Sequence, residues 1–389
     1  MKKNILIITN NFPDKNNNFI NGIFIKNQLD YLSDDYNFHV IVPSAYFPKF
    51  LTKFWPFKNY KYFASYTGYD NGKYKVYAPR FYAIIPKIFH ELKIRSAIKS
   101  VIRCINRNNI KFDFIHAHFA YPSGNIASEI KKLFNKPLII TAHAYDILEE
   151  QSKNSVINLS KKALLNSDFI ITVSENNKNV LNKRLNEKKN IIIIPNSYDE
   201  EIFNSQNKIE TRKDLNLPIN KKILINVGSL EEIKRHKDLI KAMPKLSNNI
   251  ILLIIGDGIL QDNLKSQVKR LNLNERVKFL GKIDQKNISR YLNASDLFVM
   301  TSRSEGLPTA MIESFGTGTP CVATNVGGIP QLVNEKNGIL ISYGSLDELI
   351  KSIKKALEKK WDNIEIIKSV EKYTQNRTSK QLKEVYDEF

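Results

Sequence analysis

LFVMTSRSEGLPTAMIESFGTGTPCVA, residues 297–323, predicts a strand, a loop, a helix and a second strand in direct succession. Both ends of the segment are continuously apolar, which is typical of strands buried on both faces of a parallel sheet. Between them, Gly306 permits an unusual turn, and Pro308 suits the first turn of a helix over 309–315. Parallel strands joined by a helix are the repeating unit of doubly wound α/β domains.

The same alternation continues on both sides of this segment. Further strands are expected at Asn4–Thr9, 38–42, 112–116, Leu138–Ala142, 169–173, 191–194, 223–227, Ile250–Ile255, 277–280 and 339–341. Helices are expected at 22–32, 88–106, Asn125–Phe134, 156–165, 177–185, 237–243, 261–271, 285–292 and Leu346–Glu358. The pattern predicts two doubly wound α/β domains in tandem.

The chain is also long enough for two domains, since its 389 residues exceed what one hydrophobic core usually organises. A polar stretch over 204–220 is interpreted as the linker, so residues 1–203 form the first expected domain and 204–369 the second. Ligands of such sheets bind past the carboxyl ends of the strands. The cleft between the two domains is therefore the expected site.

The formal net charge of +20 is unevenly distributed. Residues 49–111 contain fourteen Lys and Arg against Asp70 and Glu91, a balance of +12, together with many aromatic side chains. This composition indicates a surface for anionic lipid headgroups or phosphates, or a solvated face above core aromatics. No nucleic-acid motif is present, and no nucleic-acid partner is expected.

Cys104 and Cys321 lie far apart in the sequence and have no metal or redox spacing, which fits a reduced compartment. The first apolar run, ended by Thr9, is too short for a signal peptide. No run approaches the ~18 apolar residues of a membrane-spanning helix. We expect a cytoplasmic protein whose contact with a membrane, if it has one, is peripheral.

The loop and helix over 302–313 contain two carboxylates, Glu305 and Glu313. Glu305 lies just before the helix and Glu313 within it, about 12 Å further along an ideal axis. Backbone N–H groups at the start of the helix would face an anion. The two carboxylates could accept hydrogen bonds from two parts of an elongated ligand, or they could be incidental acids on a capped surface helix.

Several further segments occur with this one: VGSL over 227–230 with Lys234, GDG over 256–258, VKFLGK over 277–282, ASD over 294–296, GTPCVA over 318–323, and Gly327-Gly328 with Pro330. In their order and spacing they resemble glycosyltransferase family 4, the group of retaining enzymes with the GT-B architecture. The resemblance covers nearly the whole chain. It implies two Rossmann-like domains that face each other across a cleft, and a C-terminal helix, about 370–389, that packs back on the first domain.

The resemblance also implies roles for residues of the second domain. Glu305 would lie by the donor sugar, Glu313 would accept from ribose hydroxyls, and Lys234 would neutralise the departing diphosphate. The rest of the donor site would comprise Gly228, Ser229, Gly256, Gly258, Gly306, Leu307, Pro308 and Thr309. The alternative for Lys234 is a surface residue of the basic run 234–237.

One position departs from the family pattern. Many family members carry Arg where this chain has Ser229, so one of two expected phosphate-binding cations is missing. Arg235 or Arg303 could substitute, or Ser229 could donate only a hydrogen bond.

In the first half, the resemblance adds candidates at the ends of expected strands. His143 matches the position where the family places a histidine against the donor sugar, which makes it a catalytic candidate. His118 and Asp146 are candidates on the acceptor side, and Gly22 would let the backbone approach the donor. The alternatives are structural histidines and a turn glycine.

No Asp-x-Asp pair and no cluster of metal-ligand residues occurs, so neither a metal nor a cofactor is expected. The predicted reaction is retaining transfer of a hexose from a nucleotide-sugar, a UDP-sugar by resemblance, to a glycan or lipid-linked acceptor in cell-surface polysaccharide synthesis. A GT-B epimerase or phosphorylase is the alternative chemistry. A non-catalytic protein that binds membrane or nucleic acid through residues 49–111 is the alternative of another class.

Overall fold

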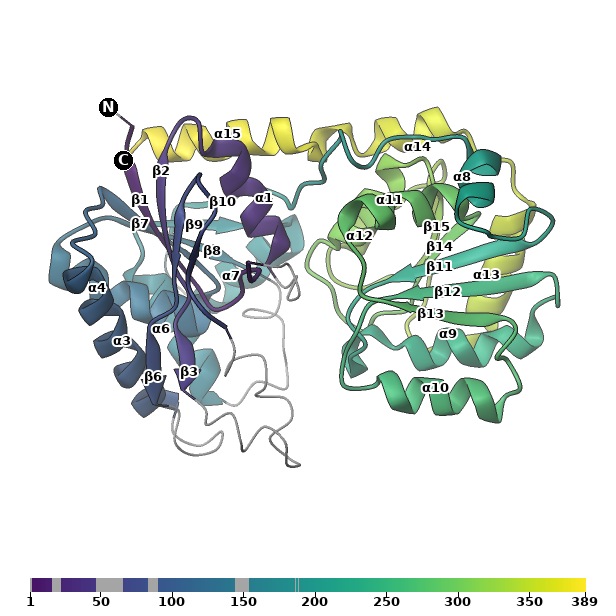
Figure 1. Cartoon of the computed structure of the whole chain (residues 1–389), viewed down its shortest axis with the longest axis horizontal. Helices are drawn as coiled ribbons and strands as arrows, with labels where there is room; N and C mark the ends of the chain where they lie inside the picture. The colour runs from purple at the N-terminus through teal and green to yellow at the C-terminus, as the bar shows by residue number, and fades with distance from the viewer. Residues whose placement is uncertain are drawn as a thin grey trace. The chain divides into compact units, whose positions relative to one another are not determined.

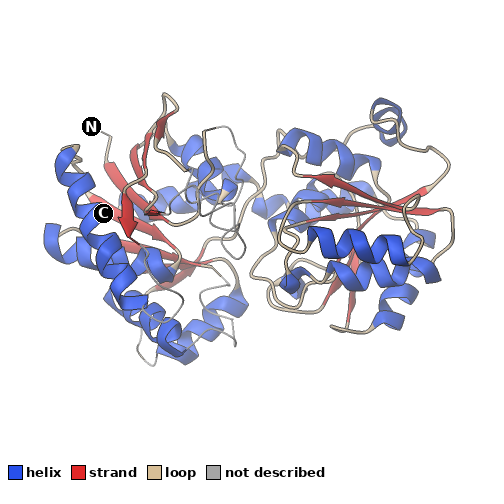
Figure 2. Cartoon of the chain, turned by 60° about the horizontal axis from the view of Figure 1, so that its bottom comes forward, coloured by secondary structure: helices blue, strands red, loops and turns tan. Residues whose placement is uncertain are grey.

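The computed structural model describes residues 2–15, 22–46, 66–82, 90–143, 154–185, 187 and 189–389. The chain divides into two compact units, one of Met1–Pro195 with Ser379–Phe389 and one of Asn196–Thr378 (Figure 1). In each unit, helices cover both faces of a mostly parallel sheet (Figure 2). The predicted fold class, two doubly wound α/β domains, is confirmed.

The first sheet has the order β10-β9-β8-β7-β1-β2-β5-β4, with one antiparallel pair, β4 and β5. Its strands are β1 (Asn4–Thr9), β2 (Asn37–Ile41), β4 (Tyr69–Asp70), β5 (Lys75–Tyr77), β7 (Phe114–His118), β8 (Leu138–Ala142), β9 (Phe169–Thr172) and β10 (Ile191–Ile193). From central β1 the chain runs outward through β2 and later returns to β7 on the other side. The topological switch point therefore lies between β1 and β7.

Alternate side chains of β1 supply two different cores. Leu6 and Ile8 pack with α3 (His90–Arg107), α4 (Asn125–Phe134), α6 (Asn154–Asn166) and α7 (Glu175–Leu185). Ile5 and Ile7 pack with α1 (Ile23–Leu32) and with the last turns of α15 (Gln375–Asp387). Each such side chain, fully buried, contributes about 1.5–3 kcal/mol. This double burial explains why the strand is continuously apolar.

The second sheet is entirely parallel in the order β13-β12-β11-β14-β15-β16. Its strands are β11 (Lys222–Val227), β12 (Ile250–Ile255), β13 (Val277–Gly281), β14 (Leu297–Met300), β15 (Cys321–Thr324) and β16 (Gly338–Ile341). One face packs on α9 (His236–Ala242), α10 (Gln261–Arg270) and α13 (Leu346–Glu358). The other carries α11 (Gln285–Ala294) and α12 (Thr309–Gly316) (Figure 1). This strand order places the switch point between β11 and β14.

The expected linker over 204–220 instead contains a helix of the second unit, α8 (Lys208–Asp214). Arg212 is buried there, 2.7 Å from Asp296 Oδ2, and also donates to the carbonyl oxygen of Ala294 at 2.8 Å. A buried ion pair gives no apolar periodicity, so the sequence pattern missed this helix. The boundaries between the units fall at residues 195/196 and 378/379 of the chain, whereas the sequence predicted them at 203/204 and 369/370. The second unit also contains an unexpected helix, α14 (Asn363–Ser369).

Short strands were also missed in the first unit. The described parts of 44–82 contain β3 (Ser44–Tyr46) and β6 (Arg80–Tyr82), which form a separate parallel pair, besides β4 and β5. The strand expected at 112–116 lies at Phe114–His118, so His118 belongs to the strand and does not follow it. Across the described residues, no helix combines the length and apolar content needed to cross a membrane.

Candidate active site

Lys234 and Glu305 meet at the switch point of the second sheet. Lys234 ends a short turn after β11, and Glu305 lies in the loop between β14 and α12. The Lys234 Nζ atom is 2.6 Å from Glu305 Oε1, and Ser302 Oγ donates to the same oxygen at 2.6 Å. Glu305 is only 8% exposed, so these two donors fix its carboxylate.

Three glycines shape the backbone beside this ion pair. A Cβ at Gly256 would lie 1.9 Å from the Gly228 carbonyl oxygen, and one at Gly258 would lie 2.6 Å from that of Leu230. At Gly228 itself, a Cβ would meet only the Lys234 stem, at 3.9 Å. Gly256 and Gly258 are thus required by packing of the strand ends, while Gly228 leaves open space beside the lysine.

Gly327 holds the loop that carries Glu305. Its φ is +56°, and a Cβ there would lie 1.8 Å from the Glu305 carbonyl oxygen, which also accepts from the Gly328 amide at 3.2 Å. Gly327 belongs to one of the segments that resemble the family, but its sequence context predicts no role for it. Its role is to let a second loop approach Glu305 closely.

The loop ends at Pro308, which precedes α12 in an extended conformation and does not lie in its first turn. Leu307 is buried, and its carbonyl oxygen accepts from Asn196 Nδ2 at 2.9 Å. Among the described residues, no side chain caps the N-terminus of α12, which begins at Thr309. Gly306 and Thr309 are half-buried, so the amides of the first turn can bind an anion.

Glu313 projects from α12 and is only 6% exposed. Burial raises the pKa of its carboxyl to about 7, although a hydrogen bond from Gln285 partly opposes the shift. Gln285 begins α11, and a contact between two separate helices leaves no pattern in the sequence.

The structure separates the two candidate substitutes for the cation missing at Ser229. Arg235 is already engaged, since its Nε donates to Asp238 at 2.8 Å and its guanidinium lies 5.9 Å from the centre of the Tyr343 ring. Arg303 follows Ser302, and its backbone amide donates to the Ile233 carbonyl oxygen at 2.8 Å. Within the described part of the chain the Arg303 side chain has no ion-pair partner, so of the two arginines it is the one not already paired.

The first unit contains a row of three histidines. His116 is structural, because Tyr386 Oη lies 2.6 Å from its Nδ1 and Thr141 Oγ1 lies 2.7 Å from its Nε2. Both ring nitrogens of His118, and Nε2 of His143, are buried without a partner among the described residues. These last two histidines can therefore bond a ligand.

Their surroundings keep His118 and His143 neutral. The His143 ring packs 5.0 Å from Phe24 and 4.6 Å from Phe119, and burial lowers its pKa to about 3. Burial also lowers the pKa of His118 well below its ordinary value. Phe119 adopts a φ of +75°, rare for a bulky residue and often found where a backbone is held for function.

Two further predicted site residues of the first unit are Gly22 and Asp146. Gly22 caps α1 with a φ of +81°, and a Cβ there would lie 2.2 Å from the Asn11 carbonyl oxygen, so packing alone requires a glycine. Asp146 lies outside the described residues. In the described ranges, no group of three or more His, Cys, Asp or Glu is placed to hold a metal ion.

Comparisons with known proteins identify the family of the chain. The family described as "Glycosyl transferases group 1" matches residues 207–378, and "Glycosyltransferase Family 4" matches residues 62–202. N-acetyl-alpha-D-glucosaminyl L-malate synthase of Bacillus anthracis is 29% identical over 260 residues, 66% of each chain.

Two further matches extend the comparison. UDP-Gal:alpha-D-GlcNAc-diphosphoundecaprenol alpha-1,3-galactosyltransferase of Escherichia coli is 29% identical over 297 residues, 72% of this chain and 76% of the relative. The structure of Anabaena HepE in complex with UDP-glucose matches the whole length of both chains with a TM-score of 0.75 at 18% identity. The family matches and the fold, together with the ion pair at the switch point, lead to one conclusion: the chain belongs to glycosyltransferase family 4 and is a glycosyltransferase of the GT-B type.

Proposed function

We propose that this enzyme transfers a hexose from a UDP-sugar, with retention at the anomeric carbon and without a metal, to a lipid-linked or glycan acceptor of cell-surface polysaccharide. The observation that carries the proposal is the Lys234–Glu305 pair beside the open backbone of Gly228. The HepE complex contains UDP-glucose, and the Escherichia coli relative is named for UDP-Gal and a diphosphoundecaprenol acceptor. Both support this choice of donor and acceptor.

In the proposed reaction, the bond between the anomeric carbon and the diphosphate breaks first, and the diphosphate keeps the electron pair. Lys234, Arg303 and the first amides of α12 stabilise the charge that develops. Glu305 accepts from sugar hydroxyls. The acceptor oxygen then attacks from the face that the diphosphate leaves and gives its proton to the departing phosphate. The neutral imidazoles of His143 and His118 orient hydroxyl groups.

Nucleotide binding tests the donor half of the proposal. UDP, GDP, ADP and CMP are compared by thermal shift and calorimetry on the wild type, Lys234→Ala and the control Lys241→Ala, which removes an exposed lysine of α9. UDP should stabilise the wild type and the control, and Lys234→Ala should bind it about 10- to 100-fold more weakly, because a hydrogen bond to a charged group contributes about 1.5–3 kcal/mol. Equal affinity in all three proteins would contradict the assignment of Lys234.

Product analysis separates the alternative chemistries. With UDP-sugar and acceptor, NMR of the product should show the anomeric configuration of the donor. Conversion of donor without acceptor would indicate an epimerase, and a requirement for inorganic phosphate would indicate a phosphorylase. Absence of any turnover, together with wild-type behaviour of Lys234→Ala, would favour a binding protein.

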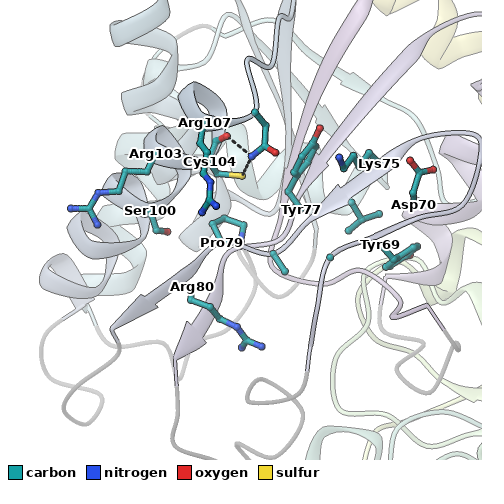
Figure 3. Close-up of a pocket in the computed structure, with 14 residues that line it drawn as sticks. Tyr69, Asp70, Lys75, Tyr77, Pro79, Arg80, Ser100, Arg103, Cys104 and Arg107 are labelled. Atoms are coloured by element: carbon teal, nitrogen blue, oxygen red, sulfur yellow. Dashed lines mark hydrogen bonds between the residues drawn. The ribbon is translucent and has the colours of Figure 1, made fainter.

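The proposal includes peripheral contact with anionic membrane on the cytoplasmic side. The described part of the basic stretch lines a cavity of about 490 Å³ with Lys75, Arg80, Arg103 and Arg107 against a single acid, Asp70 (Figure 3). Arg103 and Arg107 lie on exposed turns of α3 and have no ion-pair partner among the described residues. This excess charge favours anionic headgroups.

Vesicle flotation tests the membrane contact. The wild type should float with vesicles that contain anionic lipid and not with neutral ones, and 0.5 M salt should release it, since the Debye length falls to a few ångströms. Arg103→Glu with Arg107→Glu should reduce flotation, whereas Lys354→Glu with Lys355→Glu in the second unit should not. Salt-insensitive flotation, or none, would contradict this part of the proposal.

A further inference from the structure

A pocket of about 240 Å³ lies at the switch point of the first sheet. Its wall includes Asn10, which follows β1, and residues 121–123, which follow β7. Helix α3 contributes Ile94 and Ala97 from its first turns. Doubly wound sheets bind ligands at this place in their topology.

The wall of the pocket is mainly apolar. Ala45, Phe81, Ile94, Ala97 and Ile126 provide much of its surface. The polar groups around them are already bonded, since Ser123 Oγ donates to Asn10 Oδ1 at 3.1 Å and Tyr121 Oη lies 2.5 Å from His90 Nδ1. A sugar hydroxyl buried here would find few free hydrogen-bond partners, which costs free energy. A hydrocarbon needs no hydrogen bonds and incurs no such cost.

Among the described residues that line this pocket, Lys93 is the one with a charged side chain. It lies half-buried in the first turn of α3, and no described residue pairs with it. A ligand that is apolar in the pocket and anionic beside Lys93 would match both features.

The β3–β6 pair borders the pocket with one of its two faces. The β3–β6 pair contributes Ala45 and Phe81 to the wall and carries Tyr46 and Tyr82 next to them. These two tyrosines are 50% and 67% exposed, and their ring centres lie 5.5 Å apart. Because successive side chains of a strand point to opposite faces, this aromatic pair lies on the other face of β3–β6 from the pocket.

We propose that this pocket binds the alkyl or isoprenyl chain of a lipid-linked acceptor and that Lys93 binds the phosphate attached to that chain. The inference rests on the proposed function and assigns its acceptor subsite. The volume exceeds the ~150 Å³ of a cavity that holds benzene, so a short branched hydrocarbon segment fits.

Calorimetry on the full chain, with monomeric n-alkyl phosphates from butyl to decyl, tests the site. Affinity should rise about fourfold per methylene until the pocket is full, whereas inorganic phosphate alone should not bind. Ala45→Phe, which fills the pocket, should weaken decyl phosphate binding at least tenfold. Phe81→Ala, which removes part of the wall, should also weaken the binding of decyl phosphate. This second variant tests the pocket if Ala45→Phe does not fold.

Lys93→Gln should weaken decyl phosphate about tenfold but leave the affinity for decanol unchanged, whereas Lys99→Gln, an exposed control on the same helix, should change neither. Binding that ignores chain length, or that survives both pocket variants, would overturn the inference. UDP affinity is measured on the same samples. If UDP binds and alkyl phosphates do not, only this inference fails; if UDP does not bind the wild type, the proposed function fails.

Discussion

Glu313 carries an ionisable carboxyl that burial holds in its protonated form up to about pH 7. The unfolded chain releases this proton near pH 4.5, so the folded state binds more protons between these two values. The contribution of Glu313 to the free energy of unfolding is therefore complete below pH 4.5 and is lost as the pH rises through 7.

Glu313→Gln should remove this dependence. Against the wild type, the variant should gain stability as the pH rises from 5 to 8, by on the order of 1–3 kcal/mol. Urea titrations across this range measure the difference, and a constant difference would contradict the assigned burial. In the wild type alone, UDP affinity should also rise through pH 7, because the ionised carboxylate is the better acceptor for ribose hydroxyls.

The sequence predicts candidate residues for this site but not the side chains that hold those residues in place. Lys234, Glu305 and Glu313 were predicted because each belongs to a segment that resembles the family. The hydrogen bond from Ser302 to Glu305, and that from Gln285 to Glu313, depend on loop conformation and on packing between helices. Residue patterns along the chain carry no such information.

At the scale of elements, the close approach of two loops at Gly327 is the most sensitive feature of the second unit. Gly327→Ala adds a Cβ that would lie 1.8 Å from the Glu305 carbonyl oxygen, so the loop that carries Glu305 must shift. We expect the variant to lose at least tenfold in transfer rate and more than ~2 kcal/mol of stability.

Gly344→Ala is a matched control for this prediction. Gly344 also has a positive φ, +81°, but a Cβ there would meet nothing within 4 Å. Gly344→Ala should lower the stability by about 1–2 kcal/mol, because alanine must adopt the left-handed conformation there, and should leave the transfer rate unchanged. Activity assays and denaturant titrations on both variants separate backbone strain from displacement of the loop; equal effects would refute the role of Gly327.

Strands buried on both faces were predicted well, because their continuous apolar runs are distinctive. β1, β8, β12 and β14 have the expected bounds. Helix α8 was not predicted, since its anchor is the buried Arg212–Asp296 pair and not an apolar stripe. The short strands between 44 and 82 have too few residues for any period to be detected.

At the scale of the whole molecule, α15 begins in the second unit and ends in the first, where Tyr386 is fully buried against His116. Tyr386→Phe keeps the ring and removes only the hydroxyl, which leaves His116 Nδ1 unpaired. The first unit should lose about 1–3 kcal/mol of stability. In calorimetry, Tyr386→Phe should show a transition at a lower temperature than the wild type. The control Tyr46→Phe, which changes an exposed tyrosine, should melt like the wild type. An unchanged profile would show that this bond contributes nothing.

The path of α15 also sets an order of events during synthesis. The second unit is one continuous segment, Asn196–Thr378, and can fold as soon as it has left the ribosome. The first unit is completed later, because the face of its sheet that carries Ile5, Ile7 and Phe114 packs on Ser379–Phe389 as well as on α1. A nascent chain that stalls before residue 379 thus carries one finished domain and one whose sheet has an apolar face only partly covered, the intermediate on which chaperones would act.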